Sequence, residues 1–174
     1  MAHSDTREAQ QAGRNFVKQA MKAPLLEREQ EQDLARRWRN QGDEDALHEL
    51  VSAYVRLVVA MAARFRNYSL PMGDLIQEGT VGLMQAAERF DPEREVRFST
   101  YATWWIRAAI QDYILRNWSI VRTGTTASQK SLFFNIRRLR AQMADRPDGP
   151  LTNTSQTKIA DALMLPFADV CAME

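Results

Sequence analysis

The sequence predicts an all-α fold, because a helical apolar period dominates it and the signals of strands are absent. From Leu47 onward the apolar residues recur every three or four positions, the spacing of an amphipathic helix. No segment alternates between apolar and polar residues, and no hairpin dipeptide separates two apolar runs. A chain of 174 residues can form one domain of ordinary size or two small helical ones.

Two helices are expected in the first 65 residues. A short one over 27–39 follows Pro24, and Gly42-Asp43 supplies the break and the cap before a longer one. In the longer helix, which is clear from Leu47, the apolar residues share one face, so this helix is expected to contribute to a core. These residues are Leu50, Val51, Tyr54, Val58, Met61 and Phe65.

A third helix is expected between two prolines. It begins at about Pro71 and ends near residue 90, because Asp91-Pro92 disfavours helical backbone. Asp74 and Gln77 have the spacing of a capping box, and Pro71 fits the first turn of the helix equally well.

The fourth predicted helix is long and aromatic. Ser99 or Thr100 is expected to cap it, and it runs to about residue 117. A stretch of Thr, Gly, Ala and Ser over 123–128 then predicts a joint, and a basic amphipathic helix is expected over 129–143.

The end of the chain predicts a linker and a short helical tail. Residues 146–155, RPDGPLTNTS, are typical of a linker. The tail over 158–174 resembles the start of a helix-turn-helix, although Met164-Leu165-Pro166 stands where Gly is usual. The chain stops inside the next expected helix, which suggests a longer natural polypeptide or a truncated product. We expect an N-terminal extension, helical or disordered, then a first domain and an incomplete second domain, over 1–24, 25–120 and 121–174.

The formal net charge of +1 hides a basic middle. Residues 94–146 hold ten Lys and Arg against three acids, whereas residues 1–93 hold twelve against fifteen and residues 147–174 one against four. This asymmetry indicates contact with a polyanion in the middle and another kind of partner elsewhere. A solvated basic face is the alternative explanation.

Several function classes have no signal in the sequence. The sequence has no run of 18 apolar residues that would predict a membrane span. It also has no apolar N-terminal stretch that would predict a secretory signal. Cys171 is the lone cysteine, so an intrachain disulfide is impossible, and a free thiol fits a reducing cytoplasm. We find no GxxxxGK[ST] loop, metal-ligand cluster or nucleophile–base pair, so we expect no cofactor, no metal and no enzyme.

On a helical wheel the fourth helix separates its aliphatic residues from its large aromatic ones. Rings interleaved with arginine suit single-stranded nucleic acid, because bases stack on the rings and the cations hold the phosphates. Packing of the rings against another helix is the alternative, and Phe98 is expected in the core under either interpretation. The aliphatic side holds Ala102, Ile106, Ala109, Ile110 and Tyr113. The aromatic side holds Tyr101, Trp104, Trp105, Ala108, Gln111 and Asp112, with Arg97, Arg107 and Arg116 around them.

Three segments together resemble a known family. Residues 74–93, DLIQEGTVGLMQAAERFDPE, and residues 98–114, FSTYATWWIRAAIQDYI, resemble the second region of bacterial sigma factors of the housekeeping superfamily. Residues 128–138, SQKSLFFNIRR, resemble the signature box of the heat-shock subfamily. The resemblance covers about residues 25–174 and implies the N-terminal two-thirds of such a factor, without the C-terminal domain that reads the −35 element. The implied fold is a compact helical second-region domain followed by a small helical third-region domain.

The resemblance implies three sets of site residues. The family docks on the clamp coiled coil of the largest subunit of core RNA polymerase through positions matched by Asp74, Gln77, Glu78, Thr80 and Met84. It binds the −10 element through positions matched by Arg97, Phe98, Thr100, Tyr101, Trp104, Trp105, Ala108, Gln111 and Asp112. The heat-shock box, which implies additional polymerase contact, includes Gln129, Lys130, Leu132, Phe133, Phe134, Asn135 and Arg137.

Three of these positions depart from the family pattern. Thr80 replaces a frequent Asn, Ser131 replaces a frequent Lys of the heat-shock box, and Ala108 replaces the Gln of housekeeping members. The last change fits a different promoter preference. Without the resemblance, the polar residues around Asp74 could equally be a solvated face.

The resemblance therefore implies a cytoplasmic sigma factor for heat-shock or stress genes. Such a factor binds core polymerase and the non-template strand of the −10 element, and chaperones and proteases are further candidate partners. Two other interpretations stay open: a truncated sigma factor that sequesters core polymerase, and a free-standing helical DNA-binding regulator.

Overall fold

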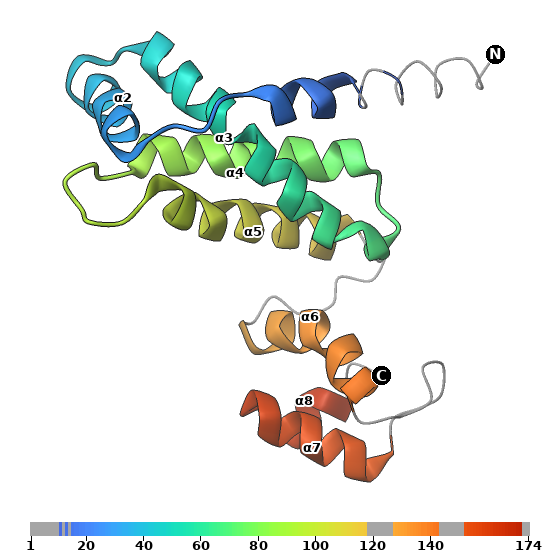
Figure 1. The fold of residues 1–174 in the computed structure, drawn as a ribbon. Helices are drawn as coiled ribbons and strands as arrows, with labels where there is room; N and C mark the ends of the chain where they lie inside the picture. The colour runs from blue at the N-terminus through green and yellow to red at the C-terminus, as the bar shows by residue number, and fades with distance from the viewer. Residues whose placement is uncertain (1–10, 12, 14, 118–126, 143–151, 172–174) are drawn as a thin grey trace. The chain divides into compact units, whose positions relative to one another are not determined.

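The computed structural model describes residues 11, 13, 15–117, 127–142 and 152–171, and the secondary structure in this part is helical throughout (Figure 1). The predicted all-α fold is confirmed. The chain divides into two compact units, Met1–Trp118 and Ser119–Glu174, which we describe separately. A helix over 15–22 lies within the predicted N-terminal extension.

The first labelled helix, α2 (Arg28–Gln41), has both ends satisfied by its own sequence. At its start, Glu27 and Gln30 form a reciprocal capping box. At its end, Gly42 adopts a left-handed conformation at φ 66°, and its N–H bonds to the carbonyl of Trp38. Glycine suits this position because it has no Cβ to clash in that conformation.

The next helix, α3 (Glu44–Arg64), begins where the sequence predicts. Asp43 caps it, because its carboxylate accepts hydrogen bonds from the backbone N–H groups of Asp45 and Ala46, both at 3.1 Å. A short 3-10 helix, η1 (Arg66–Tyr68), follows it. The predicted break and cap at Gly42-Asp43 are confirmed.

Among the described helices, α3 is long and apolar enough to pass a simple length and composition test for a membrane span. Its residues Leu50 and Val58 are fully buried and Met61 is nearly so, within the first unit. A core helix of a globular domain passes the same test, so this feature is weak support for a membrane span.

The third predicted helix is α4 (Met72–Arg89), and it begins directly after Pro71. The backbone N–H of Asp74 already bonds to the carbonyl of Pro71 at 3.1 Å. Asp74 therefore lies inside the first turn. The capping box predicted between Asp74 and Gln77 is wrong, because a capping residue must precede the helix.

The aromatic helix is α5 (Phe98–Asn117), and it begins before the cap expected at Ser99 or Thr100. That prediction is also wrong. Thr100 lies in the first turn, where its backbone N–H bonds to the carbonyl of Arg97 at 3.1 Å. The N–H of the first helical residue is bound instead by the side chain of Glu31, 67 residues earlier in the chain.

α4 and α5 pack so closely that one position admits only glycine. A Cβ added to Gly82 would lie 2.7 Å from the carbonyl oxygen of Trp105 and 2.9 Å from the Cβ of Ala109. The predicted aliphatic side of α5 faces this contact, and burying each isoleucine there stabilises the fold by about 1.5–3 kcal/mol. Its predicted members Ala102, Ile106 and Ile110 are fully buried, and so is Ile114, which the prediction did not include.

The second unit contains three described helices: α6 (Ala127–Gln142), α7 (Asn153–Leu163) and α8 (Phe167–Cys171). They enclose a small apolar core. Its buried residues are Leu132, Leu139, Ile159, Ala160 and Val170, with Ile136, Leu163 and Leu165 packed against them.

The helix-turn-helix tail forms without the usual glycine. Met164 takes the left-handed conformation at φ 52°, and the next N–H, of Leu165, bonds to the carbonyl of Ala160 at 2.9 Å. The side chain of Thr152 caps α7, so the last residues of the predicted linker, from Asn153, belong to this helix. That boundary is a correction. The rest of the predicted linker, 146–151, lies outside the described residues.

We predict that Gly82→Ala lowers the free energy of unfolding of the first unit by about 1–3 kcal/mol, because a methyl group there meets backbone atoms that cannot move aside. Gly73→Ala is the control: nothing lies within 4 Å of its added Cβ, so it leaves that energy unchanged or raises it by up to about 1 kcal/mol.

Urea titration followed by tryptophan fluorescence measures this difference, since all four tryptophans belong to the first unit. Equal midpoints for the two variants would show that the α4–α5 contact relaxes at no cost.

Candidate functional site

An unbroken run of aromatic rings leads from the core of the first unit to the aromatic side of α5. The ring of Tyr54 lies 5.0 Å from that of Phe98, and Phe98 lies 5.2 Å from Phe90. Phe90 lies 5.7 Å from Tyr101, whose ring lies 6.2 Å from that of Trp105. These centroid distances are typical of interacting rings, so the outer rings rest on buried ones.

The outer end of the run presents rings beside arginines. Trp104 is 68% exposed, and the guanidinium of Arg107 lies 5.5 Å from its ring centroid. Trp105 and Tyr101 are half-buried, and Arg89 of α4 lies 4.8 Å from the Trp105 ring. Each arginine is within cation–π range, so the rings and the positive charges form one surface.

Four other predicted DNA-binding residues surround these rings. Thr100, Ala108 and Asp112 are exposed, and Gln111 is half-buried. Asp112 pairs with Arg116 on the next turn of the helix, with 3.2 Å between Oδ2 and Nε. The exposed side of α5 is therefore aromatic at its start and polar toward its end.

Two of the predicted DNA-binding residues, Phe98 and Arg97, make contacts within the first unit itself. Phe98 is fully buried, so its expected place in the core is confirmed, and it presents no surface to DNA in this conformation. Arg97 is exposed but engaged: its Nε and Nη2 atoms each lie 3.2 Å from Glu31 Oε2, and Nη2 also donates to the carbonyl of Leu26. The bond to Glu31 is the largest cause of the raised pKa of Arg97.

Glu31 is a buried charge that sequence reasoning missed. Its carboxylate is 1% exposed and accepts hydrogen bonds from the hydroxyl of Tyr54, from Arg97 and from the backbone N–H of Phe98 at 2.6 Å. Burial raises the pKa of Tyr54 to about 12, and its hydrogen bond to Glu31 adds to the effect, so the phenol remains a donor at neutral pH. A buried carboxylate needs such donors to offset the loss of water.

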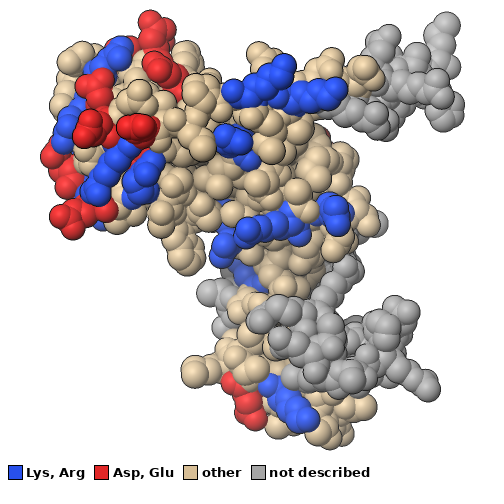
Figure 2. Space-filling model, viewed as in Figure 1, with Lys and Arg blue, Asp and Glu red and all other residues tan. Residues whose placement is uncertain are grey.

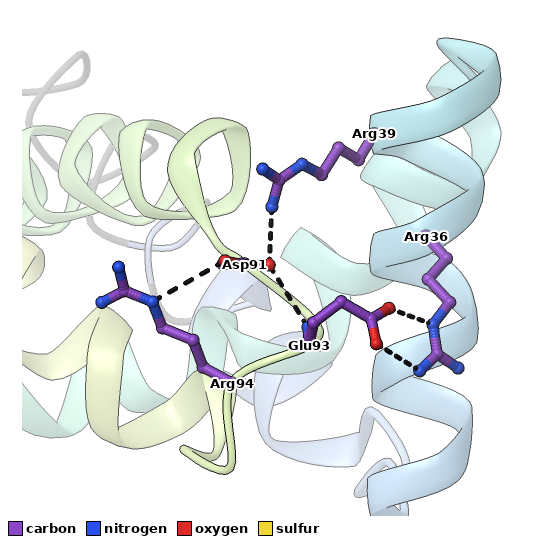
Figure 3. A network of polar contacts seen from close by, with 5 residues as sticks. All are labelled: Arg36, Arg39, Asp91, Glu93 and Arg94. Carbon is purple, nitrogen blue, oxygen red and sulfur yellow. Dashed lines mark hydrogen bonds and ion pairs between the residues drawn. The ribbon is translucent and has the colours of Figure 1, made fainter.

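Surface ion pairs hold the loop before α5 against α2 (Figure 3). Arg36 contacts both carboxylate oxygens of Glu93, at 2.8 and 3.4 Å, and Arg39 Nη1 lies 2.7 Å from Asp91 Oδ1. Arg94 lies 3.7 Å from the other oxygen of Asp91.

On the face of the first unit that Figure 2 shows, acidic side chains gather at the end that holds α2 and the start of α3, where basic side chains lie among them.

α4 has a buried face and an exposed face. Leu83 is fully buried and Ile76, Ala87 and Phe90 nearly so. The predicted polymerase-contact residues lie on the rest of the helix surface. Gln77 and Met84 are exposed, whereas Asp74, Glu78 and Thr80 are half-buried.

Three of these α4 residues already have partners within the chain. Asp74 accepts a hydrogen bond from the hydroxyl of Tyr113 at 3.0 Å, and burial and this bond raise the pKa of Tyr113. Glu78 lies 3.9 Å from Arg116, a long ion pair. The hydroxyl of Thr80 donates to the carbonyl of Ile76. The exposed face of α4 is thus tied to the far end of α5.

The heat-shock box residues lie on α6, and two of them are buried in this conformation. Leu132 is fully buried and Phe133 is 8% exposed, so neither presents a surface for a partner in this conformation. Lys130, Phe134 and Asn135 are half-buried, and the side chains of Gln129 and Arg137 lie outside the described residues. Within the described part of the chain, no cluster of three or more His, Cys, Asp or Glu could hold a metal ion.

The comparisons with known proteins agree with this geometry. The family of sigma-70 region 2 matches residues 50–120, which include α4, α5 and most of α3. This stretch of the chain is a sigma-70 region 2 domain. It is 47% identical over 166 residues to the RNA polymerase sigma factor RpoH of Rhizobium radiobacter, and 45% identical over 158 residues to that of Caulobacter vibrioides. The RNA polymerase sigma-C factor of Myxococcus xanthus is 43% identical over 159 residues.

The matched regions cover 91–95% of this chain but only 54–55% of the three relatives. The chain therefore spans just over half of their length, rather than the two-thirds that the sequence suggested.

Proposed function

We propose that the chain is part of a cytoplasmic sigma factor that binds core RNA polymerase, recognises the −10 promoter element and nucleates DNA melting. The observation that carries this proposal is the run of rings from Tyr54 to Trp105, which ends beside Arg89 and Arg107 on the exposed side of α5. Relatives named as RNA polymerase sigma factors support it. In this proposal the chain is an initiation factor and not an enzyme.

The rings would act by stacking on unpaired bases of the non-template strand. Trp104 offers the most exposed ring, while Tyr101 and Trp105 offer faces backed by other rings. Arg89 and Arg107 would hold the phosphates next to them. The polar residues around the rings, Thr100, Ala108, Gln111 and Asp112, would contact the flanking nucleotides.

The energies of stacking and pairing indicate what this surface can do alone. A base stacked on an aromatic side chain returns about 1–3 kcal/mol, whereas each duplex step is worth about 1.4 kcal/mol. Two or three captured bases therefore offset roughly two to six duplex steps. This is enough to nucleate a bubble but not to hold a full one, so the rest of the energy would come from core polymerase.

Core polymerase would dock on the exposed face of α4. This face combines the polar residues Gln77, Asp74 and Glu78 with the exposed apolar side chains of Val81 and Met84. Thr80 would contribute little, because its hydroxyl is bound to its own helix. The proposed acceptor is the clamp coiled coil of the largest polymerase subunit.

The second unit would be the third region of the sigma factor and add contacts to polymerase through Lys130, Phe134 and Asn135. Heat-shock or stress promoters are the proposed targets, since two of the cited relatives are named RpoH. Chaperones and proteases would regulate such a factor. No described feature favours a sequestering role or a free-standing regulator over initiation.

We predict that Glu78→Lys weakens binding to core polymerase about tenfold, about 1.4 kcal/mol, because it reverses a charge at the centre of the proposed docking face. Glu88→Lys is the matched control: it makes the same change on an exposed position of α4 outside the predicted contact set. Competition with a labelled sigma factor for core polymerase measures both affinities. If the two variants compete equally well, the docking face lies elsewhere.

We predict that Tyr101→Ala, in complex with core polymerase, still forms a closed complex but opens the −10 element about 5- to 100-fold less, because one stacked base is lost. Tyr101→Phe keeps the ring, so this variant is expected to open the −10 element normally. Permanganate reactivity of thymines on a promoter with a consensus −10 element measures opening. Wild-type reactivity for Tyr101→Ala would assign the ring to packing alone.

A further inference from the structure

We propose that Glu31 is a positioning residue for the DNA-contacting rings of α5. This inference rests on the proposed function and names a residue on another helix that the function requires. Glu31 lies on α2, outside the residues 50–120 that match sigma-70 region 2. It contacts none of the outer rings directly, so its effect on DNA would pass through α5.

The Glu31 carboxylate joins three separate elements. It binds the hydroxyl of Tyr54 on α3, the guanidinium of Arg97 in the loop, and the backbone N–H of Phe98 at the start of α5. The first N–H groups of a helix have no partner inside the helix, and a buried one that stays unbound is costly. Glu31, on another helix, supplies the side-chain acceptor for the first N–H of α5.

The fixed end of α5 carries the rings. Phe98 packs against both Tyr54 and Phe90, and Phe90 in turn packs against Tyr101. Tyr101 lies about one turn beyond Phe98 and Trp105 about two turns beyond it, so both belong to the part of α5 that Glu31 anchors. A shift of the helix start would move these rings relative to their buried supports.

The neighbouring surface ion pairs cannot replace this contact. Arg36 and Glu93 join the same loop to α2, but their side chains are 46% and 70% exposed (Figure 3). Exposed pairs of this kind contribute little to stability, since water and salt screen them. Glu31 is 1% exposed and serves three donors, so the loss of its charge leaves buried groups unpaired.

The test compares Glu31→Gln with Glu93→Gln in the complex with core polymerase. The two substitutions are chemically identical and both act between α2 and the loop before α5, but only Glu31 is buried. A glutamine at position 31 offers one acceptor oxygen to three donors and turns its own N–H groups toward them. Anisotropy with a labelled single-stranded oligonucleotide, the non-template strand of a −10 element, measures DNA affinity.

We expect Glu31→Gln to weaken oligonucleotide binding about tenfold and to leave the affinity for core polymerase within about twofold of the wild type. Glu93→Gln is expected to leave both unchanged. Tyr54→Phe, which deletes only the hydroxyl donor, should weaken oligonucleotide binding in the same direction by a smaller factor. It keeps the test valid if Glu31→Gln does not fold.

Two further measurements separate positioning from general loosening of the fold. Leu50→Ala, a core truncation in α3, should lower the midpoint of urea unfolding of the unit while changing oligonucleotide affinity less than Glu31→Gln does. In a Tyr101→Ala background, Glu31→Gln should have an effect of less than about twofold, because the ring through which it acts is gone.

Wild-type affinity for Glu31→Gln, equal losses for Glu31→Gln and Glu93→Gln, or a full effect that persists without the Tyr101 ring would each overturn the inference. Failure of the proposed function would look different, because the wild-type complex itself would then not bind the oligonucleotide.

Discussion

The close packing of α4 against α5 determines which side of the aromatic helix faces solvent. At Gly82 the two backbones approach so closely that a methyl group has no room, and the aliphatic stripe of α5 is buried in this contact. Because a helix has one core-facing stripe, the bulky rings of Trp104 and Trp105 must lie away from it. Their position follows from the packing of small and aliphatic residues on the opposite side.

Two contacts fix α5 along its length. At its start, the buried carboxylate of Glu31 holds the first N–H, and at its far end Tyr113 donates to Asp74 of α4. The helix with the proposed DNA surface is therefore bonded to the helix with the proposed polymerase surface. The two faces are neighbours within one small unit, which suits a factor that must bring a protein and a DNA strand together.

The sequence predicted the helices and the two sides of α5 well, because both follow from apolar periodicity. It placed the start of α4 correctly near Pro71, but it assigned the wrong capping residues at α4 and α5 for a physical reason. Local patterns at Asp74 and at Ser99 or Thr100 resemble caps, but α4 starts at the residue after Pro71, and the N–H at the start of α5 is bound by Glu31, 67 residues away. No local pattern can predict a partner at that distance. Glu31 lies among other Glu and Gln residues at the start of α2, so only its buried position singles it out.

Two of the predicted site residues lie in the core rather than on a surface. Phe98 and Leu132 match motif positions in the sequence, yet both are fully buried. A motif includes the residues that support a surface as well as those that form it, and only packing separates the two groups. Arg89 shows the reverse case, because it reaches the Trp105 ring from α4 and the wheel of α5 alone could not include it.

The most direct test of this account is the strand preference of the wild-type chain bound to core polymerase. Affinities should be measured for three labelled probes: a single-stranded non-template −10 oligonucleotide, its complement, and the duplex of the two. The account predicts that the non-template strand binds at least about tenfold more tightly than its complement or the duplex, because its unpaired bases can stack on the rings of α5. Equal affinity for the three probes, or a preference for the duplex, would contradict it.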